Sequence, residues 1–315
     1  GSASICGSDM LRVFHGHAKV MPIVLGHEYA GVIDAVGEGV PADRIGQRVA
    51  LAPLVPCMIC DACQRGLYAS CKHYSFIGSR VNGGFAEYTL APAQNLVALP
   101  DDVDLEIGAL IEPATVALHA IERGGGAEGK AVVVLGAGSI GLLTVQMARF
   151  KGAATVIATD VDNNNLEVAR LFGADAVFNP AETDAVAAVR DLTNGGVDLA
   201  LEAAGSPYAL ADAIHMANAD GHIVCVGNQP QDKSISLELI EHLMRQELNL
   251  YGTWMSYSAP FPGREWTDAV QAMQQYGDAL RAIISHRIDL RELPDTFRRI
   301  HEDRSSFRKV IITGA

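Results

Sequence analysis

Residues 131–160 read AVVVLGAGSIGLLTVQMARFKGAATVIATD, and this stretch decides the fold. It opens with five apolar residues, Ala131–Leu135, a run too short for a typical helix and without polar alternation, as expected for a strand buried on both faces of a parallel sheet. A turn with three glycines follows, and residues 140–150 then carry apolar side chains at helical spacing. The G-x-G-x-x-G turn is therefore predicted to lie at a strand-to-helix junction.

The glycines stand where a phosphate-binding turn needs them. Gly136 permits the tight turn, Gly138 lets the backbone approach a pyrophosphate, and Gly141 lets helix and strand pack closely. Free N–H groups at the helix start, around Ser139 and Ile140, would face the negative charge. The stretch therefore predicts a dinucleotide-binding unit, the alternative being a glycine turn that only packs a helix on a sheet.

Asp160 predicts which dinucleotide is bound. It ends the second apolar strand, 19 residues after Gly141. A carboxylate there can accept hydrogen bonds from the adenosine ribose and would repel a 2′-phosphate. Since no Lys or Arg lies in residues 161–167, NAD is favoured over NADP.

Composition indicates a small-molecule partner. The chain has 315 residues, enough for two domains, and a formal charge of −13, which argues against nucleic acid or an anionic membrane. Apolar runs stay shorter than the roughly 20 residues of a membrane span. A phosphorylated substrate would therefore need a local basic pocket, for which Lys19, Arg80 and Arg264 are candidates, although a solvated surface charge is the favoured interpretation of each.

Four of the six cysteines, Cys57, Cys60, Cys63 and Cys71, form the pattern C-x2-C-x2-C-x7-C. Disulfides would have to close very short loops, so the pattern indicates metal binding in a reducing compartment, and we expect the protein in the cytoplasm. Four thiolates can close a tetrahedron around zinc with no open position, which predicts a structural site. An iron–sulfur cluster, a redox pair and a nucleic-acid zinc knuckle are alternatives; the x7 gap disfavours the first and the scarcity of cations the last.

A second candidate metal site is spread along the chain. Cys6 offers a thiolate, His27 an imidazole and Glu28 a carboxylate, the ligand types of a catalytic zinc that keeps one position open. Glu112 lies in an apolar run, where an unpaired carboxylate is costly and a metal or its bound water would satisfy it. An acid at a helix start beside Pro113 is the other interpretation of Glu112.

The rest of the chain predicts two architectures. Residues 29–54 have short alternating runs typical of an antiparallel, barrel-like domain, and residues 76–90 predict a turn followed by a strand. After residue 160, strands alternate with helices, which predicts parallel βαβ units. Gly205 and Val226 lie at two strand ends, where backbone could contact the nicotinamide half of the cofactor, or where the chain simply turns.

Taken in order, these motifs resemble the zinc-containing medium-chain alcohol and polyol dehydrogenases over essentially the whole chain. The resemblance implies an α/β fold with a Rossmann doubly wound parallel sheet plus a mainly β, GroES-like barrel catalytic domain. It divides the chain into residues 1–115, a catalytic domain with the zinc loop 57–71, residues 116–257, an NAD-binding domain, and residues 258–315, which return to the catalytic domain.

The resemblance also implies residue roles. Cys6 and His27 would be ligands of a catalytic zinc, with Glu28 or Glu112 completing the sphere directly or through water, and Ser8 would receive the alcohol proton. Each chain would carry two zinc ions and NAD, and would form a homodimer or homotetramer.

The implied reaction is oxidation of a secondary alcohol of a polyol or polyol phosphate. Residues 76–88, 110–120 and 252–266 are most similar to the members that act on galactitol 1-phosphate, which is the expected substrate. Sorbitol or another hexitol, or threonine, is the alternative substrate. A non-catalytic zinc- and NAD-binding sensor is the alternative from another class.

One departure from the family concerns the start of the chain. Only five residues precede Cys6, where members of the family usually carry further strands of the first domain. If those strands are absent, we expect an exposed sheet edge and weaker folding or altered association.

Overall fold

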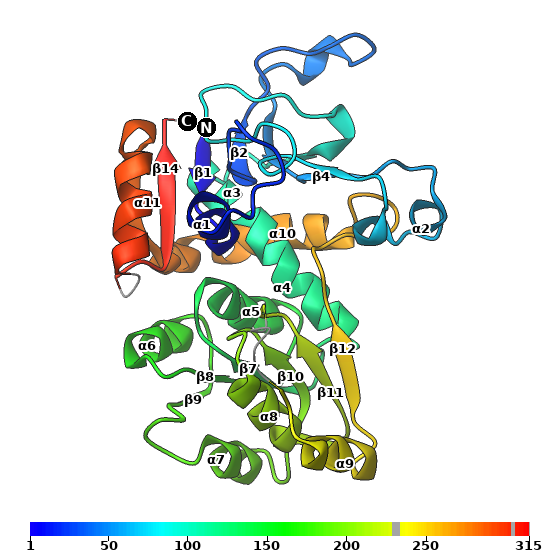
Figure 1. Ribbon diagram of the computed structural model, residues 1–315, viewed down its shortest axis with the longest axis vertical. Coiled ribbons are helices and arrows are strands. Elements are labelled where there is room, and N and C mark those ends of the chain that lie inside the picture. The colour runs from blue at the N-terminus through cyan, green and yellow to red at the C-terminus, as the bar shows by residue number, and fades with distance from the viewer. Residues whose placement is uncertain (229–233, 304–305, 315) are drawn as a thin grey trace. The chain divides into compact units, whose positions relative to one another are not determined.

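The computed structural model describes residues 1–228, 234–303 and 306–314. The chain forms two compact units (Figure 1). The first comprises Gly1–Thr115 and Ser256–Ala315, and the second comprises Val116–Met255. Within the described residues, no helix is both long enough and apolar enough to cross a membrane.

The second unit is built on a six-stranded parallel sheet in the order β9-β8-β7-β10-β11-β12. The strands are β7 (Ala131–Leu135), β8 (Thr155–Thr159), β9 (Ala176–Phe178), β10 (Val197–Glu202), β11 (Ala217–Cys225) and β12 (Asn249–Gly252). The order reverses between β7 and β10, which is the doubly wound arrangement expected from the sequence. Ligands of such sheets bind outside the carboxyl ends of the strands at this reversal.

Helices follow the strands, as the alternating pattern predicts. They are α5 (Ser139–Phe150), α6 (Asn163–Leu171), α7 (Ala185–Leu192), α8 (Pro207–Met216) and α9 (Leu237–Arg245), preceded by α4 (Ile111–Arg123), which continues from the first unit. Side chains of α7, α8 and α9 pack with the strands in one buried cluster that includes Val133, Ile157, Val189 and Ile214. The strand β11 pairs with β10 from Ala217 onward.

The first unit contains a six-stranded sheet in the order β13-β14-β1-β2-β3-β6 and a two-stranded pair, β4-β5. The strands are β1 (Ser2–Ser4), β2 (Glu28–Val32), β3 (Arg48–Leu51), β4 (Leu54–Val55), β5 (Ser75–Phe76), β6 (Leu96–Ala98), β13 (Ile284–Asp289) and β14 (Lys309–Thr313). All neighbours are antiparallel except β13 and β14. The tail therefore contributes β13 and β14 to the sheet of the first unit, and β1 is paired on both sides, with β14 and with β2.

Helices and short 3-10 turns complete this unit. The helices are α1 (Gly7–Phe14), α2 (Asp61–Gln64), α3 (Leu105–Gly108), α10 (Arg264–Leu280) and α11 (Leu293–Glu302). The 3-10 turns are η1 (Ala42–Arg44), η2 (Tyr68–Ser70), η3 (Ala93–Asn95), η4 (Arg281–Ile283) and η5 (Leu290–Glu292).

The prediction of a strand after the turn in residues 76–90 is wrong. Beyond β5, this segment forms only an isolated bridge between Ile77 and Val81. Its backbone is instead held by the loop before β2, since the amides of Gly83 and Phe85 donate to carbonyls of Val24 and Leu25. The Phe85 side chain is buried in the core at this loop.

Candidate functional site

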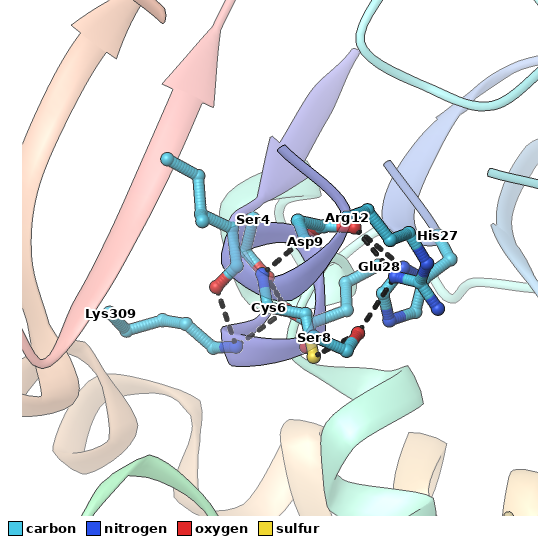
Figure 2. A network of polar contacts seen from close by, with 9 residues as sticks. Ser4, Cys6, Ser8, Asp9, Arg12, His27, Glu28 and Lys309 are labelled. Atoms are coloured by element: carbon cyan, nitrogen blue, oxygen red, sulfur yellow. Dashed lines mark hydrogen bonds and ion pairs between the residues drawn. The ribbon is translucent and has the colours of Figure 1, made fainter. Parts of the chain in front are cut away.

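Cys6, His27 and Glu28 come together in the first unit because two neighbouring strands carry them. Cys6 lies between β1 and α1, while His27 and Glu28 stand at the start of β2. The antiparallel register places Ser4 opposite Glu28, so Cys6 emerges beside His27 (Figure 2). One ligand atom from each of the three residues lies within 4.8 Å of the others, close enough for one metal ion. Sulfur, imidazole nitrogen and carboxylate oxygen form a donor set that suits zinc.

Asp9 contacts both Cys6 and His27 of this cluster, and no role for it was predicted from the sequence. It is fully buried, accepts a hydrogen bond from the Cys6 amide at 3.1 Å, and places Oδ1 3.5 Å from Nδ1 of His27. Burial by itself would raise the pKa of Asp9, but His27, Arg12 and the Cys6 amide outweigh burial and lower it. Its position three residues after Cys6, at the start of a helix, was the available signal, because an acid there accepts from the capping amide.

The surroundings of His27 favour positive charge. Burial lowers the pKa of this imidazole, but Asp9 and Cys6 together raise it well above its ordinary value. A position where neighbouring groups stabilise a cation also suits a divalent metal ion, and the donor atoms present fit zinc.

Ser8 and Arg12 extend the network along one face of α1 (Figure 2). The Ser8 hydroxyl donates to Sγ of Cys6 at 3.2 Å and accepts from Nη1 of Arg12 at 2.8 Å. Arg12 also pairs with Oδ1 of Asp9 at 2.9 Å. Ser8 therefore lies beside the metal position, as the resemblance implied, with a guanidinium fixing its orientation.

Glu28 is held from the other side by a buried cation. Nζ of Lys309, at the start of β14, lies 2.5 Å from Oε2 of Glu28, and the Ser4 hydroxyl donates to the same oxygen. Lys309 is 281 residues from Glu28 in sequence, so no local pattern could have revealed this pair.

Glu112 opens α4 and is not within ligand distance of this cluster. Burial raises its pKa to about 7, while the charges of His27 and Glu28 act on it in opposite directions. Glu112 therefore faces the same group of charges as Glu28 but has no cation in contact. The structure brings both candidate carboxylates to one region and places Glu28 nearer to Cys6 and His27.

The four cysteines of the loop 57–71 gather as predicted. None forms a disulfide, and the sulfur–sulfur separations are 4.0 Å for Cys57–Cys63, 3.5 Å for Cys60–Cys63 and 3.8 Å for Cys60–Cys71. These match the edge of a tetrahedron whose zinc–sulfur bonds are about 2.3 Å. The backbone N–H of Cys63 is the main reason that the pKa of Cys60 falls to about 6, which favours a thiolate.

Of the aromatic residues after β12, Tyr257 and Trp266 are buried in the core of the first unit, whereas Trp254 is exposed. Tyr257 stacks on Phe261 and packs near Trp266, both Tyr257 and Trp266 being buried, while Tyr68 of the cysteine loop meets Phe261 edge-on. The Tyr257 hydroxyl accepts from the Leu54 amide at 2.9 Å. Of the phosphate candidates, Arg80 lies over the ring of Tyr74 and Arg264 is 3.9 Å from Asp268.

The glycine turn of the second unit has the geometry that its pattern predicts. Gly136 has φ +91°, and a Cβ there would meet the backbone of Ala204 at 2.7 Å. A Cβ on Gly141 would lie 1.7 Å from the Gly136 carbonyl oxygen, so helix and strand could not approach otherwise. At Gly138, by contrast, a Cβ would meet nothing within 4 Å, and α5 starts at Ser139 with Ile140 next. This open space at a helix start suits a pyrophosphate.

Asp160 adjoins this turn. Its Oδ2 accepts from the Ala137 amide at 2.6 Å and its Oδ1 from the Asp162 amide at 2.8 Å. The carboxylate therefore stands at the carboxyl end of β8 against the glycine turn, with acceptor capacity left for a ribose, since each oxygen has two lone pairs.

Gly205 and Val226 lie at the carboxyl ends of β10 and β11, where a cofactor of such a sheet binds. Gly205 has φ +66° and a Cβ there would lie 2.5 Å from the Asn228 carbonyl oxygen. Its amide donates to the buried carboxylate of Glu202 at 2.8 Å, and the Val226 amide donates to the Glu202 carbonyl. Both positions are thus held by Glu202, for which no role was predicted from the sequence.

Comparison with known families agrees with this geometry. Residues 1–101 match the alcohol dehydrogenase GroES-like domain, and residues 139–275 match the zinc-binding dehydrogenase domain. Galactitol 1-phosphate 5-dehydrogenase of Escherichia coli strain K12 is 42% identical over 91% of this chain and 83% of its own length. Sorbitol dehydrogenase of Bacillus subtilis is 35% identical over 83% of this chain and 75% of its own length.

Solved structures extend the likeness to the whole fold. Galactitol-1-phosphate dehydrogenase from Escherichia coli superposes with a TM-score of 0.93 at 39% identity, covering 99% of this chain and 90% of its own. A zinc-binding dehydrogenase from Sinorhizobium meliloti 1021 bound to NADP has a TM-score of 0.90 at 32% identity. An alcohol dehydrogenase from Escherichia coli CFT073 complexed with NADH has a TM-score of 0.85 at 31% identity. Each comparison covers 99% of this chain and 89% of the other. The chain is therefore a member of the zinc-dependent medium-chain alcohol and polyol dehydrogenases, with a Rossmann sheet and a GroES-like domain.

Proposed function

We propose that the protein oxidises a secondary hydroxyl of a polyol phosphate, galactitol 1-phosphate being the first candidate, with hydride transfer to NAD. The observation that carries this proposal is the cluster of Cys6, His27 and Glu28 with Ser8 beside it, a donor set with a hydroxyl in contact. A purely structural metal site has no need of such a hydroxyl. This arrangement favours an enzyme over a non-catalytic zinc- and NAD-binding sensor.

In this proposal Cys6 and His27 hold a catalytic zinc, and Glu28 or Glu112 contributes a further oxygen. Zinc, when bound, supplies a Lewis acid that lowers the pKa of a substrate hydroxyl, and NAD supplies the hydride acceptor. Asp9 orients His27 through Nδ1, which fixes the other ring nitrogen as the ligand. The second zinc is held by Cys57, Cys60, Cys63 and Cys71.

Ser8 Oγ is the proposed acceptor of the substrate proton. For that role its own hydrogen must turn away from Sγ of Cys6, the atom to which it now donates. Arg12 donates to the same oxygen and cannot itself accept a proton, so the proton leaves Ser8 by another route. What Arg12 contributes is the orientation of Oγ, because its guanidinium donates a hydrogen bond to that oxygen.

NAD is proposed as the cofactor, with the pyrophosphate at Gly136, Gly138, Ser139, Ile140 and Gly141 and the nicotinamide half near Gly205 and Val226. Asp160 would bind the adenosine ribose, and Asp162 adds a second carboxylate two residues away. Two acids disfavour a 2′-phosphate. One structural relative is solved with NADP, so cofactor preference is a direct test of this assignment.

The substrate proposal rests on likeness to galactitol 1-phosphate dehydrogenases, and sorbitol, another hexitol or threonine is the alternative. Steady-state NAD reduction with galactitol 1-phosphate, galactitol, sorbitol and threonine tests it, together with zinc per chain by elemental analysis. We expect two zinc ions and the highest kcat/KM for the phosphate ester. Equal kcat/KM for galactitol and its phosphate would remove the case for a phosphate site, and one zinc with no turnover would favour the sensor.

We also propose that the enzyme is a cytoplasmic homodimer or homotetramer. The reduced cysteines support a reducing compartment. Light scattering coupled to size-exclusion chromatography tests the assembly, and a mass near the 33.4 kDa of one chain would contradict it.

A further inference from the structure

A cation is buried beside the candidate metal site. Lys309 has 3% of its surface exposed and Glu28 has 1%, and Nζ lies 2.5 Å from Oε2. Removing an ammonium group from water costs several kcal/mol, so Lys309 needs this carboxylate. The cation belongs to β14, which the sheet brings next to β1.

Three neighbouring strands fix the geometry. Lys309 begins β14, Ser4 ends β1 and Glu28 begins β2, and these strands lie side by side in the sheet. Both Lys309 and Ser4 donate to the same oxygen, Oε2 of Glu28 (Figure 2). The Glu28 carboxylate also belongs to the group whose ligand atoms lie within 4.8 Å of Cys6 and His27. It is therefore within reach of two cation positions, one fixed and one for the metal.

We propose that Lys309 is a positioning residue that competes with the metal ion for Glu28 and so limits how strongly this carboxylate holds the metal. The inference rests on the metal site proposed above. By keeping Oε2 in an ion pair, Lys309 and Ser4 leave Glu28 as a ligand that exchanges readily. A site that must admit substrate benefits from such a ligand, because one held tightly would block the open position.

The alternative is an ion pair that only ties the three strands together, and the two roles make different predictions. If Lys309 only ties the strands, its loss destabilises the protein equally with and without the metal. If it competes for Glu28, the metal becomes the remaining cation in contact with this carboxylate in a Lys309→Met variant. Metal-loaded protein then loses little stability, whereas metal-free protein keeps a buried, uncompensated charge and loses much.

The experiment compares wild type and Lys309→Met, each with both zinc ions and after mild chelation of the catalytic one. We expect the gap in Tm between loaded and stripped protein to widen by roughly 5–10 °C in the variant. The catalytic zinc should also leave about tenfold more slowly to a chromogenic chelator, corresponding to roughly 1.4 kcal/mol. With cobalt(II) in the catalytic site, the visible bands should weaken, because Glu28 raises the coordination number.

Two matched variants separate the roles. Lys309→Arg keeps the cation and should behave like wild type. The double variant Glu28→Gln/Lys309→Met removes the carboxylate and should return both the Tm gap and the metal-release rate to the values of Glu28→Gln alone. If Lys309→Met does not fold, Ser4→Ala removes the other donor to Oε2 and should weaken the cobalt bands in the same direction, to a smaller extent.

Equal destabilisation of loaded and stripped Lys309→Met, with an unchanged cobalt spectrum, would overturn the proposal in favour of a structural ion pair. A failure of the metal site itself has a different signature. Wild type would then hold a single zinc that Cys6→Ser does not remove, and this result would contradict the proposed function independently of Lys309.

Discussion

The first unit carries two sulfur-containing sites built on opposite plans. The four candidate ligands of the loop 57–71 are all cysteines, and they lie within 15 consecutive residues. The other site takes Cys6 from the junction of β1 and α1 and His27 and Glu28 from the start of β2. The candidate ligands of the first site come from one local segment, whereas those of the second are brought together by the pairing of β1 with β2.

The polar surroundings differ in the same way. Backbone N–H groups within the loop are the main stabilisers of the thiolate of Cys60. Around Cys6 and His27, charged side chains take this role. Asp9 pairs with His27 and with Arg12, and Lys309 pairs with Glu28. A closed site made of thiolates suits a permanent ion, while a site with adjustable charged neighbours suits chemistry.

The sharpest test of this difference removes one ligand from the open site. His27→Ala should lower kcat by about 10⁴-fold or more, equivalent to roughly 5 kcal/mol, because the metal that activates the hydroxyl is lost. Zinc content should fall from two to one per chain, while NAD binding and the circular dichroism spectrum stay close to wild type. Wild-type kcat in this variant would refute the catalytic assignment.

The complementary change is in the loop. Cys63→Ser should lower the free energy of unfolding by about 3–5 kcal/mol, since loss of a metal site is among the few single changes with so large an effect. The catalytic zinc should remain. Cys225→Ser is the matched control, a half-buried thiol outside both sites that should cost little stability. Denaturant unfolding followed by fluorescence measures both, and equal effects would contradict a structural role for the loop.

The contrast also explains what the sequence could predict. The spacing of Cys57, Cys60, Cys63 and Cys71 and that of Gly136, Gly138 and Gly141 encode short-range geometry, so both motifs are formed as expected. The αβ alternation predicted the parallel sheet for the same reason. Local motifs and periodicity thus predicted the alternation of strands and helices in the second unit, but not the helix α9.

Local sequence patterns did not predict which distant segments pair with one another. Lys309 reaches Glu28 only because β14 joins β1, and the segment predicted to form a strand after the turn in residues 76–90 is instead bonded to the backbone of residues 24–26. Asp9 lies near Cys6 in sequence, but its contact with His27 depends on the pairing of β1 with β2. Contacts that depend on which strands are neighbours do not show in periodicity or spacing.

A change behind the ligands tests whether the charged neighbours matter. Asp9→Asn keeps an acceptor for the Cys6 amide but removes the charge facing His27 and Arg12. We expect the catalytic metal to bind about 10–100-fold more weakly, as is usual when the partner of a metal-binding histidine is altered. Competition with a chelator measures the affinity, and Asp34→Asn, at an exposed acid, is the control. Unchanged affinity would show that the charge of Asp9 does not contribute to metal binding.

The smallest effect is expected in the second unit, where a substitution should leave both metal sites intact. Asp160→Ala removes the proposed ribose acceptor, and we expect NAD to bind about tenfold more weakly, near the lower limit for a hydrogen bond to a charged group. Because the same carboxylate accepts from the Ala137 amide, part of this loss would come from a looser glycine turn. Asp160→Asn keeps an acceptor without the charge, so NADP should gain relative to NAD in both variants, whereas only the alanine variant should lose the turn contact. Calorimetric titration with each cofactor separates these contributions, and the zinc content should stay at two per chain. An unchanged preference for NAD would show that the ribose is bound elsewhere.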